Sequence, residues 1–107
     1  MELSSLTQLR AVLGQDAVVV FFSGPDCGVC HVLGPKVAGL LRDQFPAVRY
    51  YEIDTARARE AAAQYGVFSV PTVIGWFEGR ELVRLGGAFG LDQLRSALAR
   101  PYALMFG

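Results

Sequence analysis

The chain has 107 residues, of which 52% are hydrophobic and 19% are charged, a composition typical of one compact domain spanning residues 1–107. Ten basic residues balance ten acidic ones, which excludes the strong net field that would favour nucleic acid or an anionic membrane surface as a partner. No apolar run approaches the roughly 18 residues of a membrane-spanning helix.

The first half of the chain predicts a helix, a strand and a second, longer helix. The opening, MELSSLTQLR, is interpreted as the first turns of a helix with Leu6, Leu9 and Leu13 on one side. Residues 17–22, AVVVFF, are β-branched and aromatic without a break, which is typical of a strand covered on both faces. A turn-rich segment then leads into a helix that is expected to run to about residue 44.

The second half predicts three more strands and two more helices. Strands are expected at residues 48–54, 71–77 and 81–85. Asp54 or Thr55 is expected to cap a helix after the first of these, and a last helix with leucines in register follows the third. A helix between the first two strands of the chain requires them to be parallel. The expected fold is therefore α/β, a mixed sheet of four or five strands with helices on both faces.

Residues 27–31, CGVCH, carry the chemistry. The opening lacks the order of a signal peptide, so a cytoplasmic location is expected, where structural disulfides are rare and a Cys-x-x-Cys pair indicates redox chemistry or a metal. At 100° per residue Cys30 lies in the apolar stripe that faces the sheet, whereas Cys27 lies at its rim. One sulfur is thus expected to be buried and the other accessible, as dithiol exchange requires.

The helix start also favours the charged form of the accessible thiol. Its free N–H groups and dipole are expected to lower the pKa of Cys27, Asp26 opposes this effect, and His31 supports it when protonated. Covalent haem is a weaker interpretation of the same letters, because His31 would point to solvent and no methionine is placed as a second ligand. Zinc requires four ligands and the chain has two cysteines and one histidine, so neither a metal nor another cofactor is expected.

The chain resembles the thioredoxin family over nearly its whole length. The matching features are the AVVVFF strand, the CGVC motif at a helix start, Pro35, the SVPT segment at residues 69–72, and the glycines Gly79 and Gly87. The resemblance implies a thioredoxin-like fold and a protein-disulfide oxidoreductase in which Cys27 and Cys30 exchange electrons with a disulfide-bearing protein substrate. It also implies a thioredoxin-reductase-like electron donor as a partner.

The resemblance further assigns the residues around the dithiol. It implies a cis bond between Val70 and Pro71, which would leave the Val70 backbone free to pair with an extended substrate segment. The residues between the cysteines, Gly28 and Val29, are expected to contact the same substrate. Gly87 would permit close backbone approach near the thiols, or it is a plain turn glycine.

Several positions depart from the family pattern. Asp26 stands where the family has tryptophan and Val29 where it has proline, while Phe21 and Tyr50 replace a buried aspartate and a lysine. No substitute for that aspartate is evident, since Glu52 is interpreted as a solvated residue.

These departures leave a second hypothesis, a thioredoxin-fold adaptor or chaperone-like binding module. The apolar C-terminal tail, PYALMFG, is relevant to it. Such a tail is expected either to pack on its own domain or to mediate self-association or contact with a partner.

Overall fold

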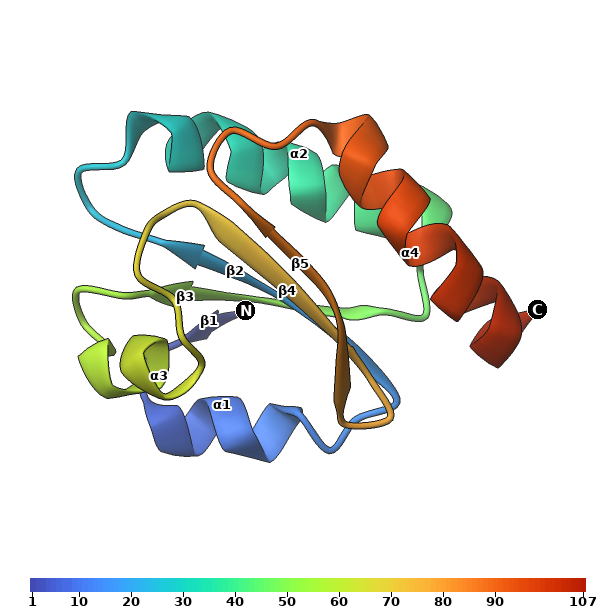
Figure 1. Ribbon diagram of the computed structural model, residues 1–107, viewed down its shortest axis with the longest axis horizontal. Coiled ribbons are helices and arrows are strands. Elements are labelled where there is room, and N and C mark those ends of the chain that lie inside the picture. The colour runs from blue at the N-terminus through green and yellow to red at the C-terminus, as the bar shows by residue number, and fades with distance from the viewer.

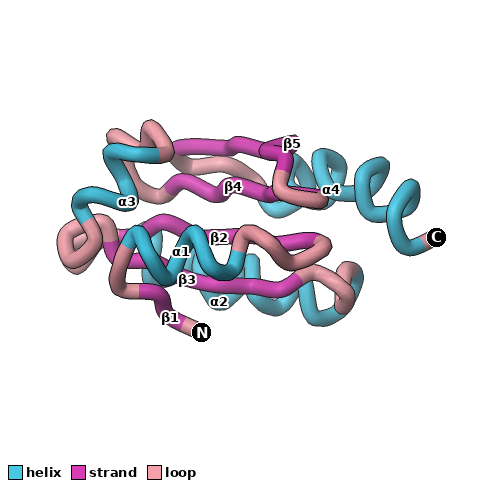
Figure 2. The backbone as a smooth tube through the Cα atoms, turned by 90° about the horizontal axis from the view of Figure 1, so that it is seen from below, coloured by secondary structure: helices cyan, strands magenta, loops and turns pink.

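A five-stranded sheet forms the centre of the computed structural model, which describes residues 1–107. Figure 2 shows the strands side by side in the order β1-β3-β2-β4-β5, with β1 and β5 at the two edges. β3 is parallel to both β1 and β2, whereas β4 is antiparallel to β2 and β5 to β4, so the predicted mixed sheet is confirmed. The strands are β1 (Glu2–Leu3), β2 (Ala17–Ser23), β3 (Arg49–Asp54), β4 (Thr72–Phe77) and β5 (Arg80–Gly86).

Helices cover both faces of this sheet. Figure 1 shows α2 and α4 on one face and α1 and α3 on the other. None of these helices combines the length and the apolar character needed to cross a membrane. The helices are α1 (Leu6–Val12), α2 (Gly28–Gln44), α3 (Arg59–Gln64) and α4 (Leu91–Phe106).

The central strand β2 supplies both halves of the core. Successive side chains of a strand point to opposite faces, so Val19 and Phe21 join the apolar cluster under α2 and α4. Val20 and Phe22 join the second cluster, under α1 and α3. All four are at most 1% exposed, which confirms the prediction of a strand buried on both faces. The loop at the carboxyl end of β2 then leads directly to the cysteines.

Two element boundaries differ from the sequence prediction. Residues 1–3 of the opening are not helical, because Glu2 and Leu3 pair with β3 and bury Leu3 against Ile53, whereas α1 follows at Leu6 with its leucines Leu6 and Leu9 buried. Neither Asp54 nor Thr55 caps α3, which begins at Arg59 without a side-chain cap. The Asp54 carboxylate instead accepts a hydrogen bond from the Ala56 N–H at 2.9 Å and shapes a turn before the helix.

The C-terminal segment, which the sequence analysis treated as a tail, is part of a helix. α4 continues through Pro101 to Phe106, so PYALMFG is largely helical. Tyr102 packs edge-on against Phe45 with ring centroids 5.1 Å apart, and its hydroxyl accepts a hydrogen bond from the Ala47 N–H. The last turns of the chain therefore pack on their own domain, while Leu104 stays 77% exposed.

Candidate active site

Both cysteines lie at the start of α2, directly after the loop that follows β2. Cys27 is the N-cap residue of the helix and Cys30 lies in its first turn. Their sulfur atoms form a disulfide, with the two Cα atoms 5.2 Å apart. Cys30 is 4% exposed and packs into the core, whereas Cys27 is only partly buried. The predicted difference in accessibility between the two sulfurs is therefore present.

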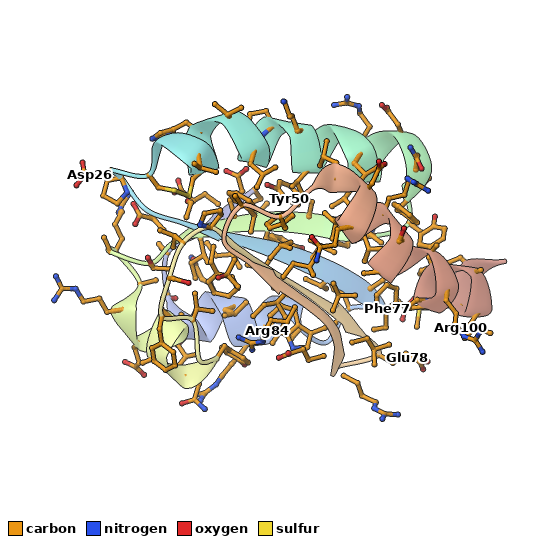
Figure 3. The ribbon with its side chains drawn as sticks, turned by 45° about the horizontal axis from the view of Figure 1, so that its top comes forward. Asp26, Tyr50, Phe77, Glu78, Arg84 and Arg100 are labelled. Carbon is orange, nitrogen blue, oxygen red and sulfur yellow. A yellow bond between two sulfur atoms is a disulfide. The ribbon has the colours of Figure 1, made fainter.

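The helix start directs one backbone hydrogen-bond donor at the Cys27 sulfur. The Cys30 N–H donates to Cys27 Sγ at 3.2 Å, so the sulfur occupies the place of an N-cap oxygen. In the reduced protein this donor and the helix dipole would stabilise a thiolate at Cys27. His31 is exposed and its Nε2 lies 3.4 Å from the Pro25 carbonyl oxygen. Figure 3 shows Asp26 at the tip of the loop, directed into solvent. The predicted influence of both residues on Cys27 stays a prediction.

The segment before β4 faces the dithiol. The Val70–Pro71 peptide bond is cis, as the resemblance implied. Val70 and Cys27 line one open hollow of about 480 Å³ in front of the accessible sulfur. No hydrogen bond within the chain uses the backbone N–H or C=O of Val70. Because backbone polar groups are almost always paired in a folded protein or its complexes, this free pair is available to an extended ligand.

Thr72 fixes the conformation of this segment through a hydrogen bond, a role that the sequence analysis did not identify. Its side chain is 6% exposed, and its hydroxyl donates to the Ser69 carbonyl oxygen at 2.8 Å across the Val70–Pro71 pair. A threonine directly after a loop proline is the kind of residue that bonds locally to backbone, which is the signal that could have indicated this role.

The residues between the cysteines face a second hollow. It has a volume of about 580 Å³, is mainly apolar and includes Gly28, Val29 and Phe89. Val29 is 50% exposed at its rim. Gly87 lies nearby, but nothing lies within 4 Å of the place where a Gly87 Cβ would be, so close approach does not explain it. The backbone conformation explains why glycine is needed at this position, since the φ of Gly87 is 72°. Its N–H also donates a hydrogen bond to the Pro71 carbonyl oxygen.

Tyr50, one of the two replaced positions, forms a polar pair with Glu52 that the sequence analysis did not foresee. Phe21 is 1% exposed and lies beside Glu52 in the register of β2 and β3. Glu52 is not simply solvated, because it is partly buried and its Oε2 accepts a hydrogen bond from the Tyr50 hydroxyl at 2.7 Å. Residues two apart on one strand share a face, which is the sequence signal for this pair.

Comparison with known proteins agrees with this geometry. The sequence model of the thioredoxin family matches residues 5–100. The chain is 33% identical to the thioredoxin-like protein YdfQ of Bacillus subtilis over 88 residues, covering 82% of this chain and 78% of that protein. It is 34% identical to chloroplastic thioredoxin M4 of Arabidopsis thaliana, covering 87% of this chain and 48% of the relative, so it spans about half the length of that protein.

Solved structures show the same fold. The X-ray structure of Fasciola hepatica thioredoxin superposes with a TM-score of 0.82 at 31% sequence identity, covering 92% of this chain and 96% of that one. The crystal structure of thioredoxin from Trypanosoma brucei brucei superposes with a TM-score of 0.81 at 25% identity, covering 92% of this chain and 87% of that one.

Proposed function

Since the chain belongs to the thioredoxin family and carries its dithiol as a 27–30 disulfide, it is a thiol–disulfide oxidoreductase, and we propose that it reduces disulfides of protein substrates with Cys27 attacking and Cys30 resolving. The observation that carries these roles is the difference in exposure between two sulfurs that are close enough to bond. Attack requires contact with a second protein, which the buried Cys30 sulfur does not allow.

The proposed reaction has two steps. The Cys27 thiolate attacks one sulfur of the substrate disulfide, and the other substrate sulfur leaves as a thiolate that takes up a proton. Cys30 then loses its proton and attacks the Cys27 sulfur, which releases the second substrate sulfur and forms the 27–30 disulfide. The substrate gains the two electrons that the cysteine pair loses.

The surface beside the sulfurs supports binding of an extended substrate segment. The free backbone N–H and C=O of Val70 can pair with the substrate backbone, as an added strand pairs with a sheet edge. Gly28 and Val29 on the other side of Cys27 offer an apolar contact without a bulky obstruction, since nothing lies within 4 Å of the place where a Gly28 Cβ would be. Gly87 supports this surface through its hydrogen bond to Pro71.

Turnover requires a source of electrons. We propose a thioredoxin-reductase-like donor that reduces the 27–30 disulfide through the same accessible sulfur. A cytoplasmic location would make reduction the net direction, and this location stays a prediction from the sequence.

Trapping of the mixed disulfide tests the assigned roles. Cys30→Ser should accumulate a covalent adduct with insulin or another disulfide protein, because the second step is blocked. Cys27→Ser should form no adduct and should lose insulin reduction. The matched comparison is informative because both variants remove one sulfur from the same turn of chain.

Titration of the wild type against glutathione ratios completes the test. A reversible 27–30 disulfide should form over a defined range of ratios. If both single variants form adducts equally, the assignment of attacking and resolving roles is wrong. If no reversible pair forms, a thioredoxin-fold binding module becomes the better interpretation.

A further inference from the structure

A third cavity, besides the two hollows that Cys27 and Val29 line, is lined by the buried cysteine, Cys30. It has a volume of about 300 Å³ and lies where the start of α2 meets β2 and β3. Phe21 and Gly34 form part of its wall. The cavity is large and polar enough to hold water, since a water molecule occupies about 30 Å³ in the liquid. Its ionisable lining residues are Glu2, Cys30, His31, Glu52 and Asp54.

This cavity gives the Cys30 thiol a route for its proton. Cys30 is 4% exposed, and its other neighbours belong to the apolar cluster under α2 and α4. Burial disfavours a thiolate, so resolution of a mixed disulfide needs a base that takes the proton as the sulfur attacks. That base must be reachable through the cavity, because the apolar core offers none.

Glu52 is the carboxylate that is held in place toward α2. The Tyr50 hydroxyl donates to Glu52 Oε2 at 2.7 Å and lies 3.4 Å from the Gly34 carbonyl oxygen. A Cβ on Gly34 would lie 3.4 Å from the same Oε2, so the absence of a side chain there lets the carboxylate approach the helix. Gly34 follows Cys30 by one helical turn, which places carboxylate and thiol on neighbouring parts of one wall. Figure 3 shows Tyr50 between β3 and α2.

The other ionisable groups of the cavity are engaged elsewhere or more open to solvent. Asp54 accepts a hydrogen bond from the Ala56 N–H, Glu2 is exposed on the edge strand, and the exposed His31 ring lies against the Pro25 carbonyl. Burial, together with the hydrogen bond to Glu52, raises the pKa of Tyr50 well above its ordinary value. The Tyr50 hydroxyl therefore remains a donor to Glu52 throughout the range in which thiols exchange.

We propose that Glu52, positioned by Tyr50, accepts the proton of the Cys30 thiol through water in this cavity when Cys30 resolves the mixed disulfide. The inference rests on the proposed function. In this step the Cys30 S–H bond breaks and its proton passes through water to the Glu52 carboxylate. The Cys30 sulfur then bonds to the Cys27 sulfur, and the substrate sulfur leaves with the electron pair of the broken disulfide bond and takes a proton from solvent.

A two-step reaction with 5,5′-dithiobis(2-nitrobenzoate) separates the two thiols. The first coloured thiolate is released when Cys27 attacks, and the second when Cys30 resolves the adduct, so stopped-flow absorbance follows each step in one experiment. Glu52→Gln should slow the second phase by about 10²-fold near neutral pH, the usual contribution of a general base, and leave the first within about twofold. The variant's second phase should also rise about tenfold per pH unit, as expected for reaction through the small thiolate fraction.

Three further variants decide whether this effect belongs to Glu52. Tyr50→Phe should slow the second phase by a smaller factor, because the carboxylate remains but loses its positioning donor. Asp54→Asn tests the neighbouring carboxylate and should leave the pH profile of the second phase unchanged. Glu60→Gln, at an exposed position of α3 outside the cavity, is the matched control for loss of one glutamate charge.

Each outcome has a defined meaning. A second phase in Glu52→Gln that is as fast as in the wild type, with the same pH profile, would overturn the inference while the proposed function stands. Transfer of the effect to Asp54→Asn would also overturn it. Absence of both phases in the wild-type protein would instead remove the proposed function.

Discussion

Replacing Thr72 by valine tests how the segment that carries Val70 is held. The change removes one hydroxyl and almost no volume. That hydroxyl donates to the Ser69 carbonyl oxygen at 2.8 Å from a side chain that is 6% exposed. A neutral hydrogen bond contributes about 0.5–1.5 kcal/mol, and the carbonyl of the exposed Ser69 can regain water. We expect a loss of about 1 kcal/mol in the free energy of unfolding, which corresponds to a decrease of roughly 4–8 °C in Tm for a domain of this size.

Thr72→Val should slow the reaction with protein substrates and leave the reaction with small disulfide reagents almost unchanged. If the hydrogen bond keeps the Val70 backbone in place for a substrate strand, its loss should reduce kcat/KM for insulin reduction by about fivefold, the equivalent of 1 kcal/mol. The reaction of Cys27 with 5,5′-dithiobis(2-nitrobenzoate) needs no strand pairing and should stay within about twofold.

Thr72→Ser is the matched control for this prediction. It keeps the hydroxyl and deletes one buried methyl group, which should lower the free energy of unfolding by about 1 kcal/mol as well. Two variants of similar stability should therefore differ in insulin reduction, with the serine variant close to the wild type. Equal rates for the two variants, or a valine variant as stable as the wild type, would refute the reasoning.

Three other predictions concern stability. Gly87→Ala should lower the free energy of unfolding, measured by urea titration, by about 1–2 kcal/mol, because the φ of Gly87 is 72°. The control Gly86→Ala, whose new Cβ would make only ordinary contacts, should change it by less than about 0.5 kcal/mol. Equal effects of the two substitutions would contradict this prediction. The hydrogen bond from Arg84 lowers the pKa of Glu81, so this pair should stabilise the fold above about pH 4.5 and lose its effect as the pH falls through the lowered pKa. Both side chains are partly exposed, so wild type and Glu81→Gln should differ by at most about 0.5 kcal/mol above that pH, and an unchanged acid titration would show that the pair contributes nothing. Tyr102→Ala should cost about 2–3 kcal/mol independently of protein concentration; a concentration-dependent loss would indicate that the last turns of α4 mediate self-association.

The features that could be predicted from the sequence are those that local periodicity controls. The unbroken apolar run of β2 required cover on both faces, and the two core clusters provide it. The angular position of Cys30 in the stripe of α2 predicted a buried sulfur beside a more accessible one at Cys27. Gly66, just after α3, and Gly79, between β4 and β5, have positive φ, a conformation that glycine adopts without a steric penalty.

The features that were missed depend on contacts between distant parts of the chain. A strand of two residues is too short to show an alternating hydrophobic pattern in the sequence. β1 forms because Leu3 pairs with Ile53 on β3. The end of α4 remains helical beyond Pro101 because Tyr102 packs on Phe45.

The proposed proton route from Cys30 to Glu52 best separates what the sequence determines from what the tertiary structure determines. The sequence by itself determined that Cys30 faces the sheet and that Tyr50 and Glu52 share one face of their strand, since both follow from the geometry of a single element. Only the tertiary structure decided that this face lies under the start of α2, where Gly34 leaves space and a cavity joins carboxylate to thiol. Packing sets which polar groups meet, because a side chain's surroundings depend on neighbours that are remote in sequence.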